Sequence, residues 1–480
     1  MAASTAPRRS LFRHPNYLKL WSAATLSLFG TQLSQIAIPF IAAVVLQASP
    51  GEVGLLTTVE FLPFLLFTLP AGVWVDRFSK KRILVIGDLG RALMLLSIPV
   101  AAVLGGLTMV QLYIVGFGIG VMTVFFDVAD QSYLPTILER DELVEGNSKL
   151  QISQSSAQIL GQPLGGGIIA LVGAPVAILV DAISYIGSAG LILWIRETGR
   201  RLRRPIGAAA SGGSAGGPAG GSATAAATEA EESTASPMAG ASVSAEARAA
   251  DADALAADAE ATGPRPGMRS QIADGLRFIF GHEYLGNIAA TTATSNLFGN
   301  IGFAIFPVFV YRELQMSPAA VGAMGGLGGA GVLIGALIAS RVQARFGVGR
   351  TIILTSALFG PVNLLIPLAT PDVALLFLSA SIFFASVNNV IYNVSQVSLR
   401  QAVTPEHFLG RMNATMRFLV WGTIPIGSLI GAGLSEVVGV RTTIWISAIL
   451  GLFAFLPVFL SKVRTIQTIP TEDPDEVAAR

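Results

Sequence analysis

Two acidic residues inside long apolar segments could do chemistry in this chain, and that chemistry is reversible proton binding. Glu60 and Asp127 each lie in a run of mostly apolar residues. Hydrocarbon disfavours a charged carboxylate, so such a group can take up and release a proton. Glu60 is the first candidate, because no Lys or Arg lies within one helical turn of it. The alternative is a protonated Glu60 that only donates a hydrogen bond.

Asp127 is the second candidate for a proton-carrying group. Its alternative role is an ion pair with Arg91 or an interaction with the loop that contains Asp76. Asp88 and Arg91 are three residues apart and would share one face of a helix. Charged pairs at that spacing usually neutralise each other.

The residue types that support most enzyme and metal chemistry are scarce. The chain has no cysteine and three histidines, all outside the expected membrane spans, and it lacks a Gly-x-x-x-x-Gly-Lys phosphate loop. We therefore expect no enzyme activity, no metal site and no cofactor.

The composition is that of a membrane protein. Of 480 residues, 52% are hydrophobic and 13% are charged, with a mean hydropathy of +0.64. Soluble domains carry about 25% charged residues. The net charge of +1 gives no basic field with which to bind nucleic acid.

The apolar segments fall into two groups of six. A membrane-spanning helix needs about 20 mostly apolar residues. The sequence predicts twelve such spans, at 17–47, 53–75, 83–105, 109–130, 151–172, 175–195, 285–311, 319–340, 351–370, 373–396, 412–434 and 442–461.

Basic residues gather in alternate connections between these spans, which predicts the orientation. We expect both termini on the cytoplasmic side of the plasma membrane. The loops expected on the other side offer little beyond Arg312 and Arg441. The basic residues on the cytoplasmic side include Lys80, Lys81, Arg82, Arg341, Arg345, Arg350, Arg400, Arg411, Lys462 and Arg464.

The two groups of spans define the expected domains. These are an N-terminal bundle at 1–198, a linker at 199–268, a C-terminal bundle at 269–465 and a cytoplasmic tail at 466–480. The linker is rich in Ala, Gly, Ser and Thr. Such a segment cannot form a core, so we expect a disordered tether rather than a regulatory element. Residues 270–280 predict an amphipathic helix on the cytoplasmic surface.

An internal repeat relates the two bundles. Shifts of 266 and 268 residues align glycines, an asparagine and an Arg-Phe pair. Two six-span units that enter the membrane from the same side are parallel repeats. Matched pairs include Asn147 with Asn413, Gly161 with Gly427, Gly165 with Gly431, Gly173 with Gly439, and Arg77-Phe78 with Arg345-Phe346.

Three stretches together resemble the major facilitator superfamily, and in particular its drug and siderophore exporters. They are the charged loop from Gly72 to Arg82, the stretch from Asp127 to Pro135, and Gln162 to Gly167. The resemblance implies an all-α membrane protein with twelve transmembrane helices in two pseudo-symmetric six-helix bundles. The third stretch is similar to an antiporter motif, with Gln162 in place of the usual Gly. Its matching residues are Pro163, Gly165, Gly166 and Gly167.

In that family fold the first, fourth, seventh and tenth helices line a central cavity, and here each carries a polar stripe. The alternative role of such residues is hydrogen bonding between helices. Asp181 lies on the sixth helix, which is peripheral in the family fold, so we interpret it as structural. The stripes hold few cations, which argues against a highly anionic substrate such as a phosphorylated sugar. The residues that we assign to the substrate cavity are Gln32, Gln35, Asn296, Asn300, Asn389 and Asn393.

The resemblance also assigns gating roles. The Asp of the charged loop would contact the start of the eleventh helix, near Arg411, where exposed amide groups favour an anion. That contact would hold the cytoplasmic side shut. The residues that we expect to form or support this gate are Asp76, Arg77, Arg82, Asp88 and Arg91.

These expectations combine into a secondary transporter that exports a small amphipathic or apolar molecule in exchange for protons. Its expected partners are a small-molecule substrate, protons and the lipid bilayer, without nucleic acid, and we expect a monomer. The alternatives are a proton-linked importer of a neutral nutrient and a non-transporting receptor or scaffold.

Overall fold

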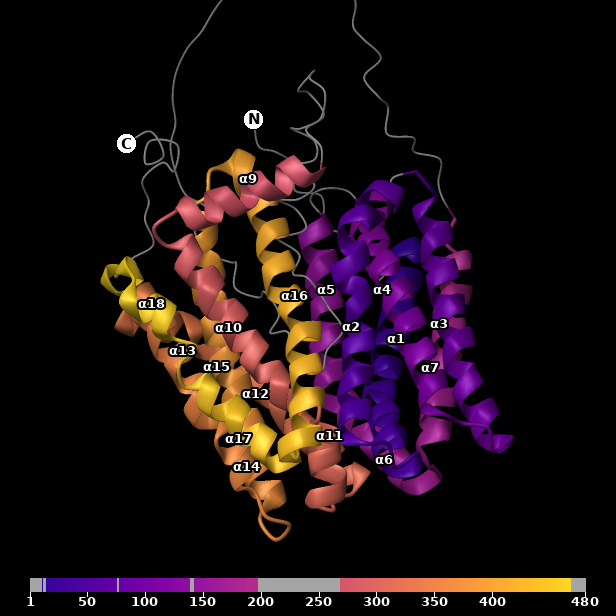
Figure 1. The fold of residues 1–480 in the computed structure, drawn as a ribbon. Coiled ribbons are helices and arrows are strands. Elements are labelled where there is room, and N and C mark those ends of the chain that lie inside the picture. Colours follow the sequence, from indigo (N-terminus) through magenta and orange to yellow (C-terminus); the bar gives the residue numbers. More distant parts are fainter. Residues whose placement is uncertain (1–10, 12–13, 76, 139–141, 197–267, 468–480) are drawn as a thin grey trace, which may run out of the picture.

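The computed structural model describes residues 11, 14–75, 77–138, 142–196 and 268–467. In this part of the chain all regular secondary structure is helical. Figure 1 shows two groups of helices side by side, α1 to α7 and α9 to α18. Asp76, the tail from residue 468 and the predicted linker up to residue 267 lie outside the described residues.

The first group is built from long apolar helices joined by short turns. The second and third helices lie on either side of the charged loop: the second ends at Val75 and the third begins at Lys80. The elements are α1 (Pro15–Phe40), η2 (Ile41–Val45), α2 (Pro50–Val75), α3 (Lys80–Val103), α4 (Met109–Ile137), α5 (Leu143–Ser156), η4 (Ala157–Gly161), α6 (Gln162–Val172) and α7 (Ala174–Leu193).

The second group follows the same plan after a short leading helix, α9 (Met268–Gly281). Its other elements are α10 (Leu285–Phe303), α11 (Phe306–Val308), η5 (Phe309–Glu313), α12 (Pro318–Phe346), α13 (Val348–Asn363), α14 (Leu365–Leu368), α15 (Ala374–Ala402), α16 (Glu406–Val438), α17 (Val440–Gly451), α18 (Leu456–Leu460) and η6 (Lys462–Thr465).

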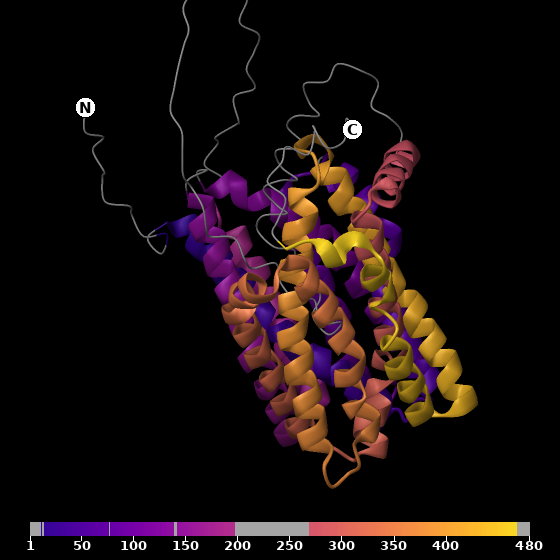
Figure 2. The same cartoon turned by 90° about the vertical axis from the view of Figure 1, so that its left-hand side faces the viewer.

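Both views place α9 at one end of the long helices, and Figure 2 shows the helices of the second half running between the two ends. We call this end the α9 end and the opposite one, where η2 and η5 lie, the η2 end. Side chains are described on α9 from Gly275 onwards. There Phe278 stacks on Phe408, with ring centroids 4.7 Å apart, so α9 packs against the start of α16.

Eleven helices in the described part of the chain are long and apolar enough to cross a membrane, whereas twelve spans were expected. The missing one is the fifth, which the structure forms as α5, η4 and α6 in one helical run from Leu143 to Val172. Its first half is polar, with Lys149, Gln151 and Gln154 among its residues. The composition of this run, and not its helicity, keeps it below the threshold for an apolar span.

The internal repeat extends to backbone details. The first helix of each half ends in a π-helical turn, η2 and η5, and each turn is followed by a glutamine with positive φ. These are Gln47, at 54°, and Gln315, at 52°. Gly173 and Gly439, which the repeat aligns, both have positive φ and join the last two helices of their halves. Positive φ strains residues that carry a Cβ atom, which is why glycine occupies these tight turns.

Repeated glycines also let helices approach within each half. A Cβ atom added to Gly161 would lie 2.8 Å from the Cβ of Gln32, and one added to Gly427 would lie 2.9 Å from the Cβ of Asn300. The repeat aligns the two glycines. The close pairs of helices are therefore equivalent in the two halves, α1 with the η4–α6 run and α10 with α16.

Contacts between the halves gather at the η2 end and midway along the helices. The Gly51 amide of α2 donates a 2.7 Å hydrogen bond to Oε1 of Glu436 on α16. Arg312 Nε donates to the carbonyl oxygen of Ala43 at 2.6 Å. One buried apolar cluster contains Ile41 of the first half and Phe309 of the second. The η2 end is thus closed by contacts between the halves.

Candidate functional site: a cavity between the two halves

A cavity of about 650 Å³ lies between the halves. The first half contributes α1, α2, α4 and the η4–α6 run to its wall, and the second contributes α10, α11, α12, α13, α14, α15, α16 and α17. At one extreme it reaches Phe306 and Ile444, near the η2 end. At the other it reaches Arg400 and Asn413, close to the α9-end termini of α15 and α16. The cavity therefore extends from the closed end towards the α9 end.

Four of the six predicted cavity residues line this space. They are Asn296 and Asn300 on α10 and Asn389 and Asn393 on α15. Of the described residues, Gln32 and Gln35 are not in the lining, so the structure does not place these two in the cavity. Gln32 is buried against η4 and α6.

Gln32 nevertheless contacts a residue of the cavity wall. Its Oε1 atom accepts a 3.2 Å hydrogen bond from Gln162, which lines the cavity. Gln32 can therefore orient a wall residue without itself reaching the cavity.

Along α15 the polar side chains form one hydrogen-bonded row. Arg400 donates to Oε1 of Gln396 at 3.0 Å, Gln396 donates to Oδ1 of Asn393 at 3.3 Å, and Asn393 donates to Oδ1 of Asn389 at 3.3 Å. The residues are three or four positions apart, so they follow one face of the helix. All four line the cavity.

The polar residues of α10 are arranged differently. Asn296 donates to the carbonyl oxygen of Thr292 at 3.1 Å, and Asn300 donates to that of Asn296 at 2.8 Å. Thr292 and Tyr392 share a 2.7 Å hydrogen bond between their hydroxyl groups, which places α10 beside α15. Each of these two asparagines therefore uses an amide N–H group in a hydrogen bond to the backbone of its own helix.

Aromatic side chains form the apolar part of the wall midway along the helices. Phe64 of α2 packs on Trp421 of α16, with ring centroids 5.2 Å apart, and Phe61 lies beside Phe64. The contact between Phe64 and Trp421 joins the two halves at the cavity. An apolar wall with a few placed polar groups is typical of a small-molecule site.

Two arginines in the lining were not predicted there. Arg400 was expected in a loop after a span that ends at residue 396, but α15 continues to Ala402. Arg417 lies on α16, with its guanidinium carbon 5.4 Å from the Trp421 ring centroid. The spacing of Arg400, four residues after Gln396, was the sequence signal that it continues the polar stripe.

Glu60 faces the neighbouring helix α4 from α2, rather than the cavity. A Cβ atom added to Gly116 of α4 would lie 2.8 Å from Cγ of Glu60, so the absence of a side chain at Gly116 makes room for Glu60. Within the described residues, the Glu60 carboxyl group has no hydrogen-bond or ion-pair partner.

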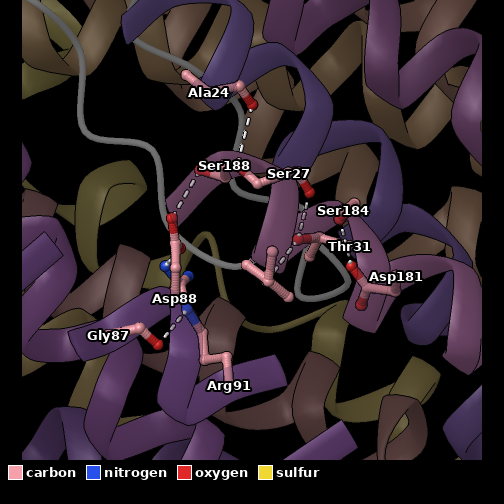
Figure 3. A network of polar contacts seen from close by, with 10 residues as sticks. Ala24, Ser27, Thr31, Gly87, Asp88, Arg91, Asp181, Ser184 and Ser188 are labelled. Atoms are coloured by element: carbon pink, nitrogen blue, oxygen red, sulfur yellow. Dashed lines mark hydrogen bonds and ion pairs between the residues drawn. The ribbon is translucent and has the colours of Figure 1, made fainter. Parts of the chain in front are cut away.

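A buried charge cluster occupies the space between α1, α3 and α7 (Figure 3). Arg91 and Asp88 form a 2.6 Å ion pair on α3, and Ser188 of α7 donates to the other oxygen of Asp88 at 2.6 Å. Asp181 of α7 accepts hydrogen bonds from Ser184 and from Ser34 of α1. These bonds agree with a structural role for Asp181.

Arg91 connects this cluster to the second proton candidate. Its guanidinium group lies over the rings of Phe126 and Tyr185, and it interacts electrostatically with Asp88, Asp127 and Asp181. A single guanidinium group thus interacts with three carboxyl groups in the interior of the first half. Pairing with Arg91 is the role that the sequence analysis gave for Asp127 as the alternative to proton coupling.

The remaining gate residues lie on the surface, where the structure describes them. Arg77 and Arg82 are exposed. Asp76 is outside the described residues, as are the side chains of Glu406 and His407 at the start of α16. That helix begins at Glu406, five residues before the predicted start near Arg411. The proposed contact between Asp76 and α16 therefore stays a prediction.

The antiporter-like motif lies where the halves meet. Gly166 of α6 packs on Gly322 of α12, since a Cβ atom added to Gly166 would lie 3.0 Å from the Gly322 Cα atom. Pro163 packs on Gly326 in the same way, and Gly165 packs on Leu33 of α1. Gly167 has open space around it. Three of the four motif residues thus form close contacts with α1 or α12.

The described residues give no support for a metal site. No group of three or more His, Cys, Asp or Glu side chains in this part of the chain is placed to hold an ion.

The chain belongs to the Major Facilitator Superfamily, whose pattern matches residues 20–283 and 284–478. It is thus a multi-pass membrane protein of a transporter family, not an enzyme. It is 26% identical over 198 residues to the MFS-type transporter YkuC of Bacillus subtilis, covering 41% of this chain and 45% of that protein. The chain therefore spans less than half of that relative's length.

A second relative matches over nearly its whole length. It is the multidrug efflux pump Tap of Mycolicibacterium fortuitum, 24% identical, with 95% of this chain and 97% of the pump covered.

Among solved structures, the fold is similar to a bacterial homologue of the iron transporter ferroportin. The inward-facing structure gives a TM-score of 0.64 at 14% identity and covers 94% of this chain and 99% of the other. The outward-facing structure of a ferroportin homologue gives 0.52, also at 14% identity, covering 93% and 98%. At this identity the likeness concerns the fold alone.

Proposed function

We propose that this protein exports a small amphipathic or apolar molecule across the plasma membrane in exchange for protons. One observation carries the proposal. A cavity of about 650 Å³ lies between two pseudo-symmetric halves that meet at the η2 end, while the cavity extends towards the α9 end. A site between repeats that is closed on one side is the arrangement that alternating access requires.

The distribution of charge supports a cytoplasmic α9 end. Lys80, Lys81 and Arg82 begin α3 there, and Arg341 and Arg345 end α12 there. Connections at the η2 end carry Glu52, Glu313 and Asp372 beside few cations. Cytoplasmic loops are enriched in Lys and Arg. In this orientation the cavity extends towards the cytoplasm, from which an exporter takes its substrate.

Export, rather than import, is favoured by the near full-length similarity to a multidrug efflux pump. The aromatic wall around Phe61, Phe64 and Trp421 fits an amphipathic or apolar substrate. Such surfaces bind many molecules by shape and burial, and each contact contributes modestly.

Glu60 and Asp127 are the proposed proton-coupling residues. Glu60 lies against Gly116 without an ionic partner among the described residues, which leaves its carboxyl group able to change protonation state. Asp127 is near Arg91, so its proton affinity depends on how that arginine is shared with Asp88 and Asp181. We place Glu60 first for this reason.

The test uses the purified full-length protein in proteoliposomes, with an imposed pH gradient and a panel of lipophilic fluorescent dyes. We expect proton-driven accumulation of at least one dye, and its loss in Glu60→Gln. The matched control is Glu52→Gln, at the start of the same helix, where the carboxylate binds the nearby Ser49 amide. Normal transport by Glu60→Gln would remove Glu60 from the mechanism. Failure to move any dye under either gradient direction would overturn the proposed function.

A further inference from the structure

A groove of about 330 Å³ lies on the surface of the second half, between α12, α13 and α15. We call it the α13 groove. Leu354, Leu358 and Phe384 in its wall are about half exposed, so the groove is open along one side. Among the described residues, none lines both this groove and the cavity between the halves. Because the three helices have the length and composition of membrane spans, the α13 groove opens towards lipid.

The wall of the α13 groove is apolar. Its polar members among the described residues are Thr351, Thr355 and Asn388. Thr351 donates a 2.7 Å hydrogen bond to the carbonyl oxygen of Gly347. Thr355 and Asn388 donate hydrogen bonds of 2.7 and 2.8 Å to the carbonyl oxygens of Thr351 and Thr355. The backbone thus accepts from all three side chains, and the wall that remains fits a hydrocarbon chain.

The length of the groove matches one leaflet of a bilayer. Its wall on α13 runs from Thr351, in the first turn at the α9 end, to Val362. At about 1.5 Å per residue this wall is about 16 Å long, close to half of the roughly 30 Å hydrocarbon core of a membrane. A lipid chain that enters at the α9 end would therefore be covered as far as the middle of the membrane.

Two exposed arginines lie at the α9 end of the groove. Arg345 directly precedes Phe346 and Arg350 directly precedes Thr351, and both of these following residues line the groove. Arg350 is also one helical turn before Leu354, so it extends the face of α13 that forms the wall. In the described part of the chain neither arginine has an ion-pair partner.

The helices around the groove do not supply an acid to these arginines. There is no Asp or Glu in α12, α13 or α15. The other described elements that pack on α13, namely α10, α14, α17, α18 and η6, also contain none. The repeat aligns the turn between α12 and α13 with the charged loop of the first half, and Ala344 stands where that loop has Asp76. The second copy of the loop therefore keeps its cations and lacks its acid.

We propose that the α13 groove binds an anionic phospholipid of the leaflet at the α9 end. One acyl chain lies along the groove, and the acidic headgroup lies against Arg345 and Arg350. Basic surfaces between membrane helices bind anionic headgroups, and each Lys or Arg adds to the attraction. The other faces of α12 and α15 line the cavity between the halves, so the lipid would contact the outer side of the cavity wall. This site lies outside the cavity and goes beyond the proposed function.

The test measures which lipid contacts the groove in the full-length protein, reconstituted in phosphatidylcholine nanodiscs. The chain has no cysteine, so Leu358→Cys in the groove wall gives a single attachment point for a bimane fluorophore. The probes are nitroxide-labelled phosphatidylglycerol and phosphatidylcholine with identical acyl chains, which quench bimane on contact. We expect phosphatidylglycerol to associate with this position about fivefold or more tightly, the factor that a single arginine near the surface contributes.

A second reporter separates the groove from the basic surface in general. Leu89→Cys on α3 is the match, because Leu89 is exposed to a similar extent and α3 also begins with basic residues at the α9 end. We expect the preference for phosphatidylglycerol to be at least about threefold smaller at this position. An equal preference at the two reporters would overturn the inference.

The charge of the site is tested by removing both arginines. Arg345→Gln combined with Arg350→Gln should bring the affinities of the two lipids at the Leu358→Cys reporter to within about twofold of each other. The matched control is Arg77→Gln combined with Arg82→Gln, the aligned pair in the first half, which should leave the preference unchanged. A preference that survives the loss of Arg345 and Arg350, or that falls equally in the control, would contradict the headgroup placement.

Val387→Phe tests whether the acyl chain occupies the groove. The larger side chain fills part of the groove while both arginines remain. We expect the preference at the Leu358→Cys reporter to fall to the value at Leu89→Cys. A preference that persists would mean that lipid contacts the arginines without entering the groove, which would overturn the inference. None of these measurements requires transport, so their outcome is independent of the dye experiment.

Discussion

Gly51 and Glu436 join the two halves of the protein at the η2 end. The Gly51 amide, at the start of α2, donates a 2.7 Å hydrogen bond to the carboxylate of Glu436, near the end of α16. Three residues along α2, Gly54 packs on Ala432. The hydrogen bond exists only while this end is closed, so it favours the closed arrangement.

Glu436→Ala should shift the protein towards opening at the η2 end. The lost hydrogen bond is worth about 1 kcal/mol, which corresponds to about a fivefold change in population. The chain has no cysteine, so Met324→Cys in the cavity wall provides a single reporter. Its labelling by a membrane-impermeant maleimide, added from the η2 side, should accelerate by about that factor. Glu52→Ala is the control, since its carboxylate bonds within its own half, and a similar acceleration there would contradict the prediction.

Gly166→Ala should disturb the closed state more strongly. The new methyl group would meet the carbonyl oxygen of Pro318 and would lie 3.0 Å from the Gly322 Cα atom, and both are backbone atoms of the other half that cannot rotate away. Overpacking of this kind costs about 1–3 kcal/mol. The same Met324→Cys reporter should label faster than in the parent. Gly167→Ala, one residue along with open space around it, should leave labelling unchanged. Equal effects of the two substitutions would show that the contact with α12 does not limit opening.

Arg91→Met should destabilise the first half. It removes the buried partner of Asp88 and leaves that carboxyl group among Ser188 and the α3 backbone. Breaking a buried ion pair from one side costs about 3–5 kcal/mol. The measurement is thermal unfolding of the purified protein in detergent. Adding Asp88→Asn to Arg91→Met should recover part of the loss, and a double variant as unstable as the summed single variants would argue against a coupled pair.

The turn between α9 and α10 should loosen as the pH falls. Burial lowers the pKa of His282, and the neutral ring accepts a 3.2 Å hydrogen bond from the Tyr284 amide through Nδ1. As the pH drops through the ordinary histidine pKa, the unfolded chain therefore binds more protons than the folded one. The contribution of His282 to the free energy of unfolding is complete above that pKa and falls as the pH decreases through it.

The check on His282 is the difference in Tm between the protein and His282→Gln, measured from pH 7.5 to pH 5.5. We expect the advantage of the original protein to shrink as the pH decreases. A difference that stays constant would mean that burial does not lower the pKa of His282, and one that grows towards acid pH would mean that folding favours the charged ring.

The sequence predicted the fold class because span length, apolar composition and the placement of basic residues are local properties. It also predicted the repeat, whose aligned glycines form equivalent turns and close contacts in both halves. It placed four of the cavity asparagines on the correct helices. The predicted fifth span, at 151–172, lies within the helical run Leu143–Val172, and eleven further helices in the described part of the chain have the length and composition of a membrane span.

The tertiary structure alone decided which polar faces meet. Asp88 and Ser188 are 100 positions apart in the chain, and their hydrogen bond depends on how α3 and α7 rotate and pack. The position of Arg400 in the cavity depends on where α15 ends, and the direction of its hydrogen-bonded row depends on four side chains sharing one face. Which end is closed depends on contacts between the halves. Such contacts follow from the packing of many side chains, which no local sequence pattern encodes.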